Sequence, residues 1–191
     1  MFSQATDLAM VNRDRSRLYS PPLSSTIQVK TWVSYLIWRH PVIFYTRLQN
    51  PTNDYVAAKI ADMEGGTAAM LTSSGQAANF FALFNICQAG DHIVSSSSIY
   101  GGTFNLISVT MAKMGIEATF VSPDCTEEEL NAAFKENTKA VFGETIANPA
   151  LTVLDIEKFA KAAHAHHVPL IVDNTFPTPV NCRPIEWAQI L

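Results

Sequence analysis

The sequence predicts an α/β domain with a mainly parallel sheet and helices on both of its faces. Between Thr67 and Asn174, short apolar runs alternate with helix-like runs of ten or more residues. Connections of that length let successive strands run in the same direction through right-handed crossovers. In addition, 48% of the 191 residues are hydrophobic and only 16% are charged, so the chain has enough apolar residues for one sizeable core.

Each predicted element follows from a local pattern. A helix over residues 52–64 is indicated by Val56, Ile60 and Met63 at helical spacing, and Gly65-Gly66 is typical of its end. The five predicted strands cover residues 67–71, 92–94, 116–121, 139–142 and 169–173. The predicted helices between them cover residues 76–87, 103–114 and 156–166, and the spacing of Thr126 and Glu129 predicts a capping box at the start of one more.

Two further expectations concern packing and domain boundaries. In the helix over residues 76–87, Phe80, Phe81 and Phe84 are expected to face the core. Residues 1–50 show no clean period and are predicted to form an N-terminal arm, whereas residues 51–191 are predicted to form the large domain.

Composition argues against several classes of protein. The formal net charge is −4 and the basic residues are scattered, which disfavours a nucleic-acid partner. No apolar run is long enough to span a membrane, and charged residues lie where a signal peptide would be apolar, so a cytoplasmic protein is expected. The three cysteines lie far apart and are expected to be free thiols. The histidines of residues 164–167 have no metal-site spacing, so no metal is predicted.

The carboxyl ends of parallel strands meet at one edge of a sheet, and ligands of such sheets bind there. Ser74, Gly75 and Gln76 run from a predicted strand into a helix, so the backbone amides of Gly75 and Gln76 can face an anion at the helix N-terminus. An ordinary strand-to-helix turn is an equally acceptable interpretation of these residues taken alone.

Asp173 ends the most hydrophobic predicted strand, where a carboxylate needs a cationic or hydrogen-bonding partner. A protonated pyridine nitrogen would be such a partner, although the carboxylate could instead brace the loop at Asn174-Thr175. Tyr100 precedes Gly101-Gly102 at another strand's exit, where its ring can lie over a flat ligand or simply pack.

Asn148 follows the fourth predicted strand, where its amide can contact a ring oxygen or belong to an Asn-Pro turn. An anion site, an aromatic ring, an amide and a carboxylate at one edge together suit pyridoxal 5'-phosphate. The lysine that would bond covalently to this cofactor is not found, because no lysine follows Asp173 in the 191 residues.

Over about residues 45–187, the chain resembles the cysteine and methionine metabolism family of pyridoxal-phosphate enzymes. The similar segments are YTRLQNPT at 45–52, SSGQAA at 73–78, YGGT at 100–103, ETIANP at 144–149 and VDNTF at 172–176. The resemblance implies a fold-type I pyridoxal-phosphate-dependent transferase large domain, incomplete in this chain.

The resemblance also implies roles for individual residues. Gly75 and Gln76 would bind the cofactor phosphate through their backbone amides, and Ser74 would add a cofactor contact. Tyr100 would stack on the ring and is the one residue expected to be catalytic. Asp173 would bond the pyridine nitrogen, Asn148 would contact the ring hydroxyl, and Thr175 would add a cofactor contact. Tyr45 and Arg47 would reach the phosphate bound by a neighbouring subunit, which implies a homo-oligomer, as a tetramer built from two dimers.

Two segments, GGTFNL at 101–106 and NCRPIEW at 181–187, look most like the O-acetylhomoserine sulfhydrylases of this family. That likeness implies O-acetyl-L-homoserine and sulfide or a thiol as substrates, with acetate replaced to give homocysteine. Cystathionine γ-synthase, cystathionine γ-lyase and methionine γ-lyase remain alternatives, as does a non-catalytic fragment. Residues 30–44 and 188–191 do not resemble the family, and without the lysine the chain itself is expected to be inactive.

Overall fold

The computed structural model describes residue 46 and residues 50–187. The chain divides into two units, Met1–Lys59 and Ile60–Leu191. The predicted N-terminal arm over residues 1–50 lies almost entirely outside the described residues. Helix α3, Pro51–Glu64, begins after Asn50, whose side chain accepts hydrogen bonds from the backbone N–H groups of Thr52 at 2.9 Å and Asn53 at 3.3 Å.

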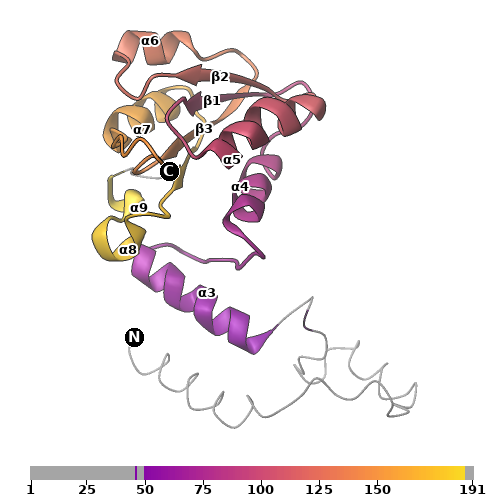
Figure 1. Ribbon diagram of the computed structural model, residues 1–191, viewed down its shortest axis with the longest axis vertical. Helices are drawn as coiled ribbons and strands as arrows, with labels where there is room; N and C mark the ends of the chain where they lie inside the picture. The colour runs from indigo at the N-terminus through magenta and orange to yellow at the C-terminus, as the bar shows by residue number, and fades with distance from the viewer. Residues whose placement is uncertain (1–45, 47–49, 188–191) are drawn as a thin grey trace, which may run out of the picture. The chain divides into compact units, whose positions relative to one another are not determined.

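Four parallel strands form the sheet of the second unit (Figure 1). They are β1 His92–Ser96, β2 Glu117–Val121, β3 Thr138–Glu144 and β4 Leu170–Asp173. Their order is β2-β1-β3-β4, so β1 and β3 are central and β4 forms an edge of this sheet. Glu144 and Asp173 pair in register, which places the carboxyl ends of β3 and β4 side by side.

Helices pack on both faces of the sheet, as predicted. On one face lie α4 Gly75–Phe84, α5 Gly101–Asn105 and the π-helix η1 Leu106–Met111. On the other lie α6 Glu127–Ala132 and α7 Ile156–Ala165, and two short helices follow, α8 Thr178–Asn181 and α9 Pro184–Trp187.

Alternation along the central strands divides the apolar core into two clusters. Val94 and Val141 pack with the α6 and α7 side, which supplies Leu130 and Phe159. Ile93, the neighbour of Val94, packs with the α4 and η1 side. Because successive side chains of a strand point to opposite faces, each central strand contributes to both clusters.

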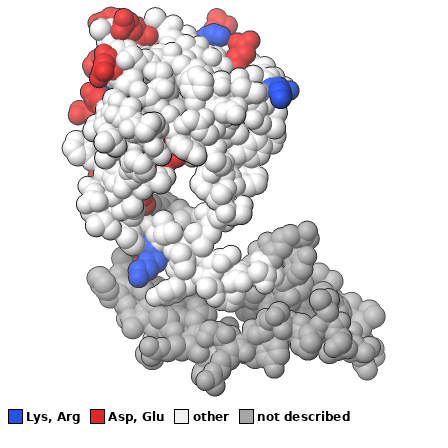
Figure 2. All heavy atoms as spheres, in the orientation of Figure 1, with Lys and Arg blue, Asp and Glu red and all other residues white. Residues whose placement is uncertain are grey.

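The predicted helix start at Thr126 is confirmed. The Thr126 hydroxyl accepts from the Glu129 N–H at 3.2 Å, and the Glu129 carboxylate accepts from the Thr126 N–H at 2.9 Å. Three glutamates occupy the first turn of α6, where the helix dipole favours them. Figure 2 shows these acidic side chains gathered over α6, while much of the described surface in the same view carries no charge.

Two expectations about the region before β1 are wrong. Residues 67–71 form no strand, and the side chain of Met70 is 74% exposed. A strand needs a neighbour for its backbone hydrogen bonds, and no strand in the described part of the chain pairs with this segment. Phe80 packs against the core as expected, but Phe81 and Phe84 are 51% and 48% exposed, because Leu83 and Asn79 occupy the buried side of α4.

The cysteines are free thiols, as expected. Cys87 and Cys125 are buried and Cys182 is half-buried. Burial raises the pKa of the Cys87 thiol to about 11, with a further contribution from the charge of Asp91. His166 at the end of α7 stacks on Phe134 with 4.0 Å between ring centroids, which gives it a packing role.

Among residues 46 and 50–187, no group of three His, Cys, Asp or Glu side chains is arranged to hold a metal ion. Within the same residues, no helix is both long enough and apolar enough to cross a membrane.

Candidate functional site

Three hydrogen bonds connect α4, the residues at the start of α5 and the ends of β3 and β4 at the carboxyl edge of the sheet. Asn79 of α4 donates to Asp173 Oδ2 at the end of β4, over 2.9 Å. Gln76 of α4 donates to Thr103 Oγ1 of α5 over 2.8 Å. The backbone N–H of Tyr100, which precedes α5, donates to Glu144 Oε2 at the end of β3 over 2.6 Å. These three bonds join α4, α5, β3 and β4 around one edge.

The first turn of α4 leaves two backbone donors open. Ser74 is the N-cap, and its hydroxyl accepts from the Ala77 N–H at 3.1 Å. The N–H groups of Gly75 and Gln76 find no acceptor among the described residues. A Cβ atom at Gly75 would meet nothing within 4 Å, so the backbone there is open to a ligand. The geometry suits an anion at the helix N-terminus.

The Tyr100 ring lies beside this edge and is accessible. Tyr100 is 45% exposed and precedes the first turn of α5. Its ring lies over Gly102, where a Cβ atom would come within 2.5 Å of the Tyr100 Cε1 atom. The glycine therefore gives the aromatic ring the space it occupies.

Asp173 accepts three hydrogen bonds. Its Oδ2 atom accepts from Asn79, and its Oδ1 atom accepts from the Thr175 N–H at 3.1 Å and from the Thr175 hydroxyl. The loop-bracing interpretation is therefore correct for Oδ1, and Thr175 contacts Asp173 directly. A carboxylate offers about four lone-pair sites, so Asp173 retains capacity for one more donor.

Glu144 is the most enclosed acidic group of the site, at 5% exposure. Burial raises the pKa of its carboxyl group, and the nearby charge of Asp173 raises it further. The hydrogen bond from the backbone N–H of Tyr100 opposes this rise. Glu144 therefore joins the loop before α5 to the end of β3.

The structure places the remaining predicted residues unequally. Asn148 is half-buried in the loop after β3, with a cis peptide bond to Pro149. Tyr45 and Arg47 lie outside the described residues, so their roles stay predictions.

Sequence reasoning missed Asn79 and Thr103. Asn79 is 8% exposed and Thr103 is 1% exposed, and they bond to each other at 3.2 Å. The available signal was that Asn79 is the one polar residue in the run Ala77–Phe84, whose other residues are apolar. A polar group on the buried side of a helix needs a partner, and here the partners are Thr103 and Asp173.

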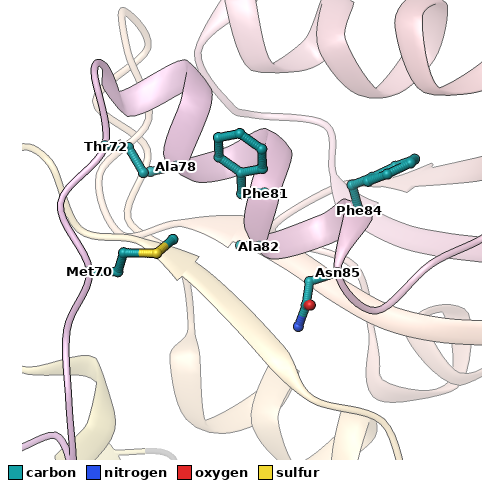
Figure 3. A pocket seen from close by; sticks show the side chains of 7 residues that line it. All are labelled: Met70, Thr72, Ala78, Phe81, Ala82, Phe84 and Asn85. Atoms are coloured by element: carbon teal, nitrogen blue, oxygen red, sulfur yellow. The ribbon is translucent and has the colours of Figure 1, made fainter. Parts of the chain in front are cut away.

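An apolar groove of about 500 Å³ lies on another side of α4 (Figure 3). Its lining comprises Met70, Thr72, Ala78, Phe81, Ala82, Phe84 and Asn85. None of the predicted site residues lines it, so this groove is separate from the polar edge of the sheet.

Known proteins resemble the chain over most of its length. The family model described as Cys/Met metabolism PLP-dependent enzyme matches residues 10–189. The match therefore includes residues 30–44 and 188–189, which were expected not to resemble the family. An O-acetyl-L-homoserine sulfhydrylase of Corynebacterium glutamicum is 49% identical over 142 residues, which are 74% of this chain and 32% of that protein. A homocysteine/cysteine synthase of Saccharomyces cerevisiae is 46% identical over 148 residues, covering 77% of this chain and 33% of that protein. The chain thus spans about a third of the length of these curated relatives.

Solved structures of two enzymes are similar to the structure of this chain. A putative O-acetylhomoserine (thiol)-lyase of Campylobacter jejuni, solved with N'-pyridoxyl-lysine-5'-monophosphate, matches with a TM-score of 0.76 and 35% identity. That match covers 86% of this chain and 40% of the other. Cystathionine γ-lyase of Lactobacillus plantarum matches with a TM-score of 0.73 and 38% identity, over 80% of this chain and 39% of the other. The chain therefore belongs to the family of pyridoxal-phosphate-dependent enzymes of cysteine and methionine metabolism.

Proposed function

We propose that this chain is the cofactor-binding part of an enzyme that replaces the acetate of O-acetyl-L-homoserine with sulfide and so produces homocysteine. The observation that carries the proposal is the joining of Asp173 to α4 through Asn79, which puts a carboxylate and two open amides at one edge. The O-acetyl-L-homoserine sulfhydrylases among the relatives support this choice of substrate.

The residues present fit pyridoxal 5'-phosphate in kind. Two backbone N–H groups without an acceptor among residues 50–187, at Gly75 and Gln76, suit its phosphate. The unused acceptor capacity of Asp173 suits its protonated ring nitrogen. When bound, this cofactor supplies an electron sink that stabilises negative charge on the substrate carbon bearing the amino group.

Each residue of the proposed site then has a defined task. Gly75 and Gln76 bind the phosphate through N–H donors, and the capping bond of Ser74 holds that helix start in place. The exposed Tyr100 ring covers one face of the pyridine ring. Asp173 holds the proton on the ring nitrogen, Thr175 holds one oxygen of Asp173, and Asn148 contacts the ring hydroxyl.

We further propose that the active unit is a homo-oligomer, a tetramer of two dimers, located in the cytoplasm. The family resemblance supports this assembly, because it assigns Tyr45 and Arg47 to the phosphate held by a neighbouring subunit.

A chimeric enzyme tests the proposed reaction. The 142 matching residues of the Corynebacterium glutamicum relative are replaced by those of this chain, and homocysteine is measured after adding O-acetyl-L-homoserine and sulfide. We expect turnover well above a no-protein control. The same chimera with Asp173→Ala is expected to lose about a hundredfold in kcat, since a preorganised charge at the reacting group contributes on that order.

Two outcomes would contradict the proposal. A folded, cofactor-loaded chimera that cleaves cystathionine or methionine but forms no homocysteine from sulfide would favour a γ-lyase. Near-normal turnover with Asp173→Ala would show that the carboxylate only braces its loop.

The isolated 191-residue chain, which has no lysine after Lys161, is expected to give no turnover.

A further inference from the structure

We propose that Asn79 is a positioning residue that orients the Asp173 carboxylate toward the cofactor's ring nitrogen, with Thr103 holding Asn79 in place. The proposal rests on the proposed function, because it assumes the cofactor lies at the carboxyl edge of the sheet. It goes further in assigning a task to two buried side chains of α4 and α5 that the reaction itself does not use.

The chemistry of the partners fixes the orientation of the Asn79 amide. An ionised carboxylate only accepts hydrogen bonds, so the Asn79 nitrogen, and not its oxygen, faces Asp173. This nitrogen lies 2.9 Å from Asp173 Oδ2 and 3.2 Å from Thr103 Oγ1. Both hydrogens of the amide are therefore engaged, and the amide cannot rotate without losing a bond.

Thr103 is itself fixed by a second donor. Its hydroxyl oxygen accepts from Gln76 Nε2 at 2.8 Å as well as from Asn79, and the residue is 1% exposed. The chain of bonds thus runs from Gln76 through Thr103 and Asn79 to Asp173. The Asn79–Thr103 bond is buried and the other two bonds are partly buried, so these bonds are stronger than they would be in water and restrict the motion of Asn79.

Helix α4 consequently carries both ends of the proposed site. Its first N–H groups, at Gly75 and Gln76, are open to the phosphate, and Asn79 lies one turn further along. A helix rises about 1.5 Å for each residue, so the phosphate donors and the residue that holds Asp173 are about 6 Å apart along one rigid axis. The helix therefore fixes the spacing between the phosphate and pyridine ends of the site.

The test compares two ligands on the full chain and its variants. Dissociation constants are measured by absorbance for pyridoxal 5'-phosphate and for its carbocyclic analogue, in which C–H replaces the ring nitrogen. Asn79→Leu is expected to weaken binding of pyridoxal 5'-phosphate about tenfold, the order expected from a hydrogen bond to a charged group. Binding of the analogue should be unchanged, because it places no N–H opposite Asp173.

Variants at Thr103 keep the proposal testable if Asn79→Leu does not fold. Thr103→Val should reproduce the ligand-specific loss, and Thr103→Ser, which retains the hydroxyl, should restore the affinity. The matched control is Asn137→Leu. It removes a hydrogen bond of 2.7 Å that the Asn137 side-chain amide donates to the Gly90 carbonyl, at the amino end of the sheet. It should alter stability but neither dissociation constant.

The outcomes distinguish a failure of this inference from a failure of the proposed cofactor site. Equal losses for both ligands in Asn79→Leu and Thr103→Val would show a merely structural role and overturn this inference alone. Unchanged affinities in both variants would overturn it as well. If the unaltered chain binds neither ligand, the proposed cofactor site and this inference both fail.

Discussion

The Tyr100 ring and Gly102 share one small space before α5. A Cβ atom at position 102 would approach the Tyr100 Cε1 atom to 2.5 Å, closer than real contacts allow. The ring is the flexible member of this pair, so a side chain at 102 would displace the ring before it disturbed the backbone. One hydrogen-sized side chain thus decides where the aromatic ring can lie.

Gly102→Ala tests this pairing. We expect the variant to fold with nearly unchanged stability but to bind pyridoxal 5'-phosphate about tenfold more weakly, because the displaced ring no longer covers the pyridine face. Titration by absorbance measures the affinity, and thermal unfolding measures stability.

Gly101→Ala is the matched control for that experiment, because a Cβ atom at Gly101 would meet nothing within 4 Å. It should leave the affinity as it is. Equal losses of affinity in both variants would mean that backbone flexibility before α5, and not the position of the Tyr100 ring, controls binding.

His92 links three strands at the amino end of the sheet, away from the proposed site. It is fully buried at the start of β1, and its ring nitrogens lie 2.8 Å from the hydroxyls of Thr138 in β3 and Thr119 in β2. Burial lowers the pKa of His92, and the nearby charge of Lys135 lowers it further, while Glu117 opposes them. The neutral ring is therefore part of the folded sheet.

This burial predicts a loss of stability in acid. The pKa of His92 is lower in the folded than in the unfolded state. Its contribution to the free energy of unfolding is therefore complete above its ordinary pKa of 6.5 and is lost as the pH falls through the folded pKa. Each pKa unit between the two states corresponds to about 1.4 kcal/mol. Urea unfolding of the wild type and of His92→Gln, from about pH 8 to about pH 5, measures the free energy of unfolding of each. The wild type's excess over the variant should shrink as the pH falls.

A second variant separates His92 from the other histidines. His164→Gln, at the end of α7, should keep the acid-dependent loss seen in the wild type. A constant difference between wild type and His92→Gln at every pH would show that His92 does not titrate differently on folding.

The apolar groove beside α4 is an exposed surface of the sheet-bearing unit. Met70, Phe81 and Phe84 line it and are 74%, 51% and 48% exposed. Phe80 and Phe84 stack with 5.1 Å between their ring centroids, so part of the aromatic surface packs on itself. An exposed apolar surface of this kind binds hydrophobic compounds and promotes association.

The isolated chain should therefore bind a hydrophobic fluorescent dye. Phe81→Gln combined with Phe84→Gln, which keeps good helix formers in α4, is expected to remove most of the dye signal with little loss of helix content by circular dichroism. Phe176→Gln replaces another exposed aromatic, 46% exposed and outside the groove, and should leave most of the signal. Equal losses in both would place the dye elsewhere.

Local patterns predicted the strands and helices whose partners lie within the described chain. Short apolar runs predicted β1 to β4, and the capping pattern at Thr126 predicted α6, because these signals are contained in a few neighbouring residues. Residues 67–71 have a similar apolar run, but a strand also requires a paired neighbour, which no local pattern encodes.

The site shows the same division between local and distant information. Gly75 and Asp173 were identifiable because each lies at the junction of a predicted element and a loop. Asn79 was not, because its partner Asp173 is 94 positions away and only the folded chain brings them together. The exposure of Phe81 likewise depends on which side of α4 the sheet covers.

The π-helix after α5 has a consequence for how this chain tolerates changes of length. A π turn holds one more residue than an α turn, so losing one residue from Leu106–Met111 would restore ordinary helix without rotating Thr103 away from α4. The same deletion between Gln76 and Asn79 would turn the two ends of α4 by about 100° relative to each other. Natural variation in length should therefore accumulate in η1 and be excluded from the first turns of α4.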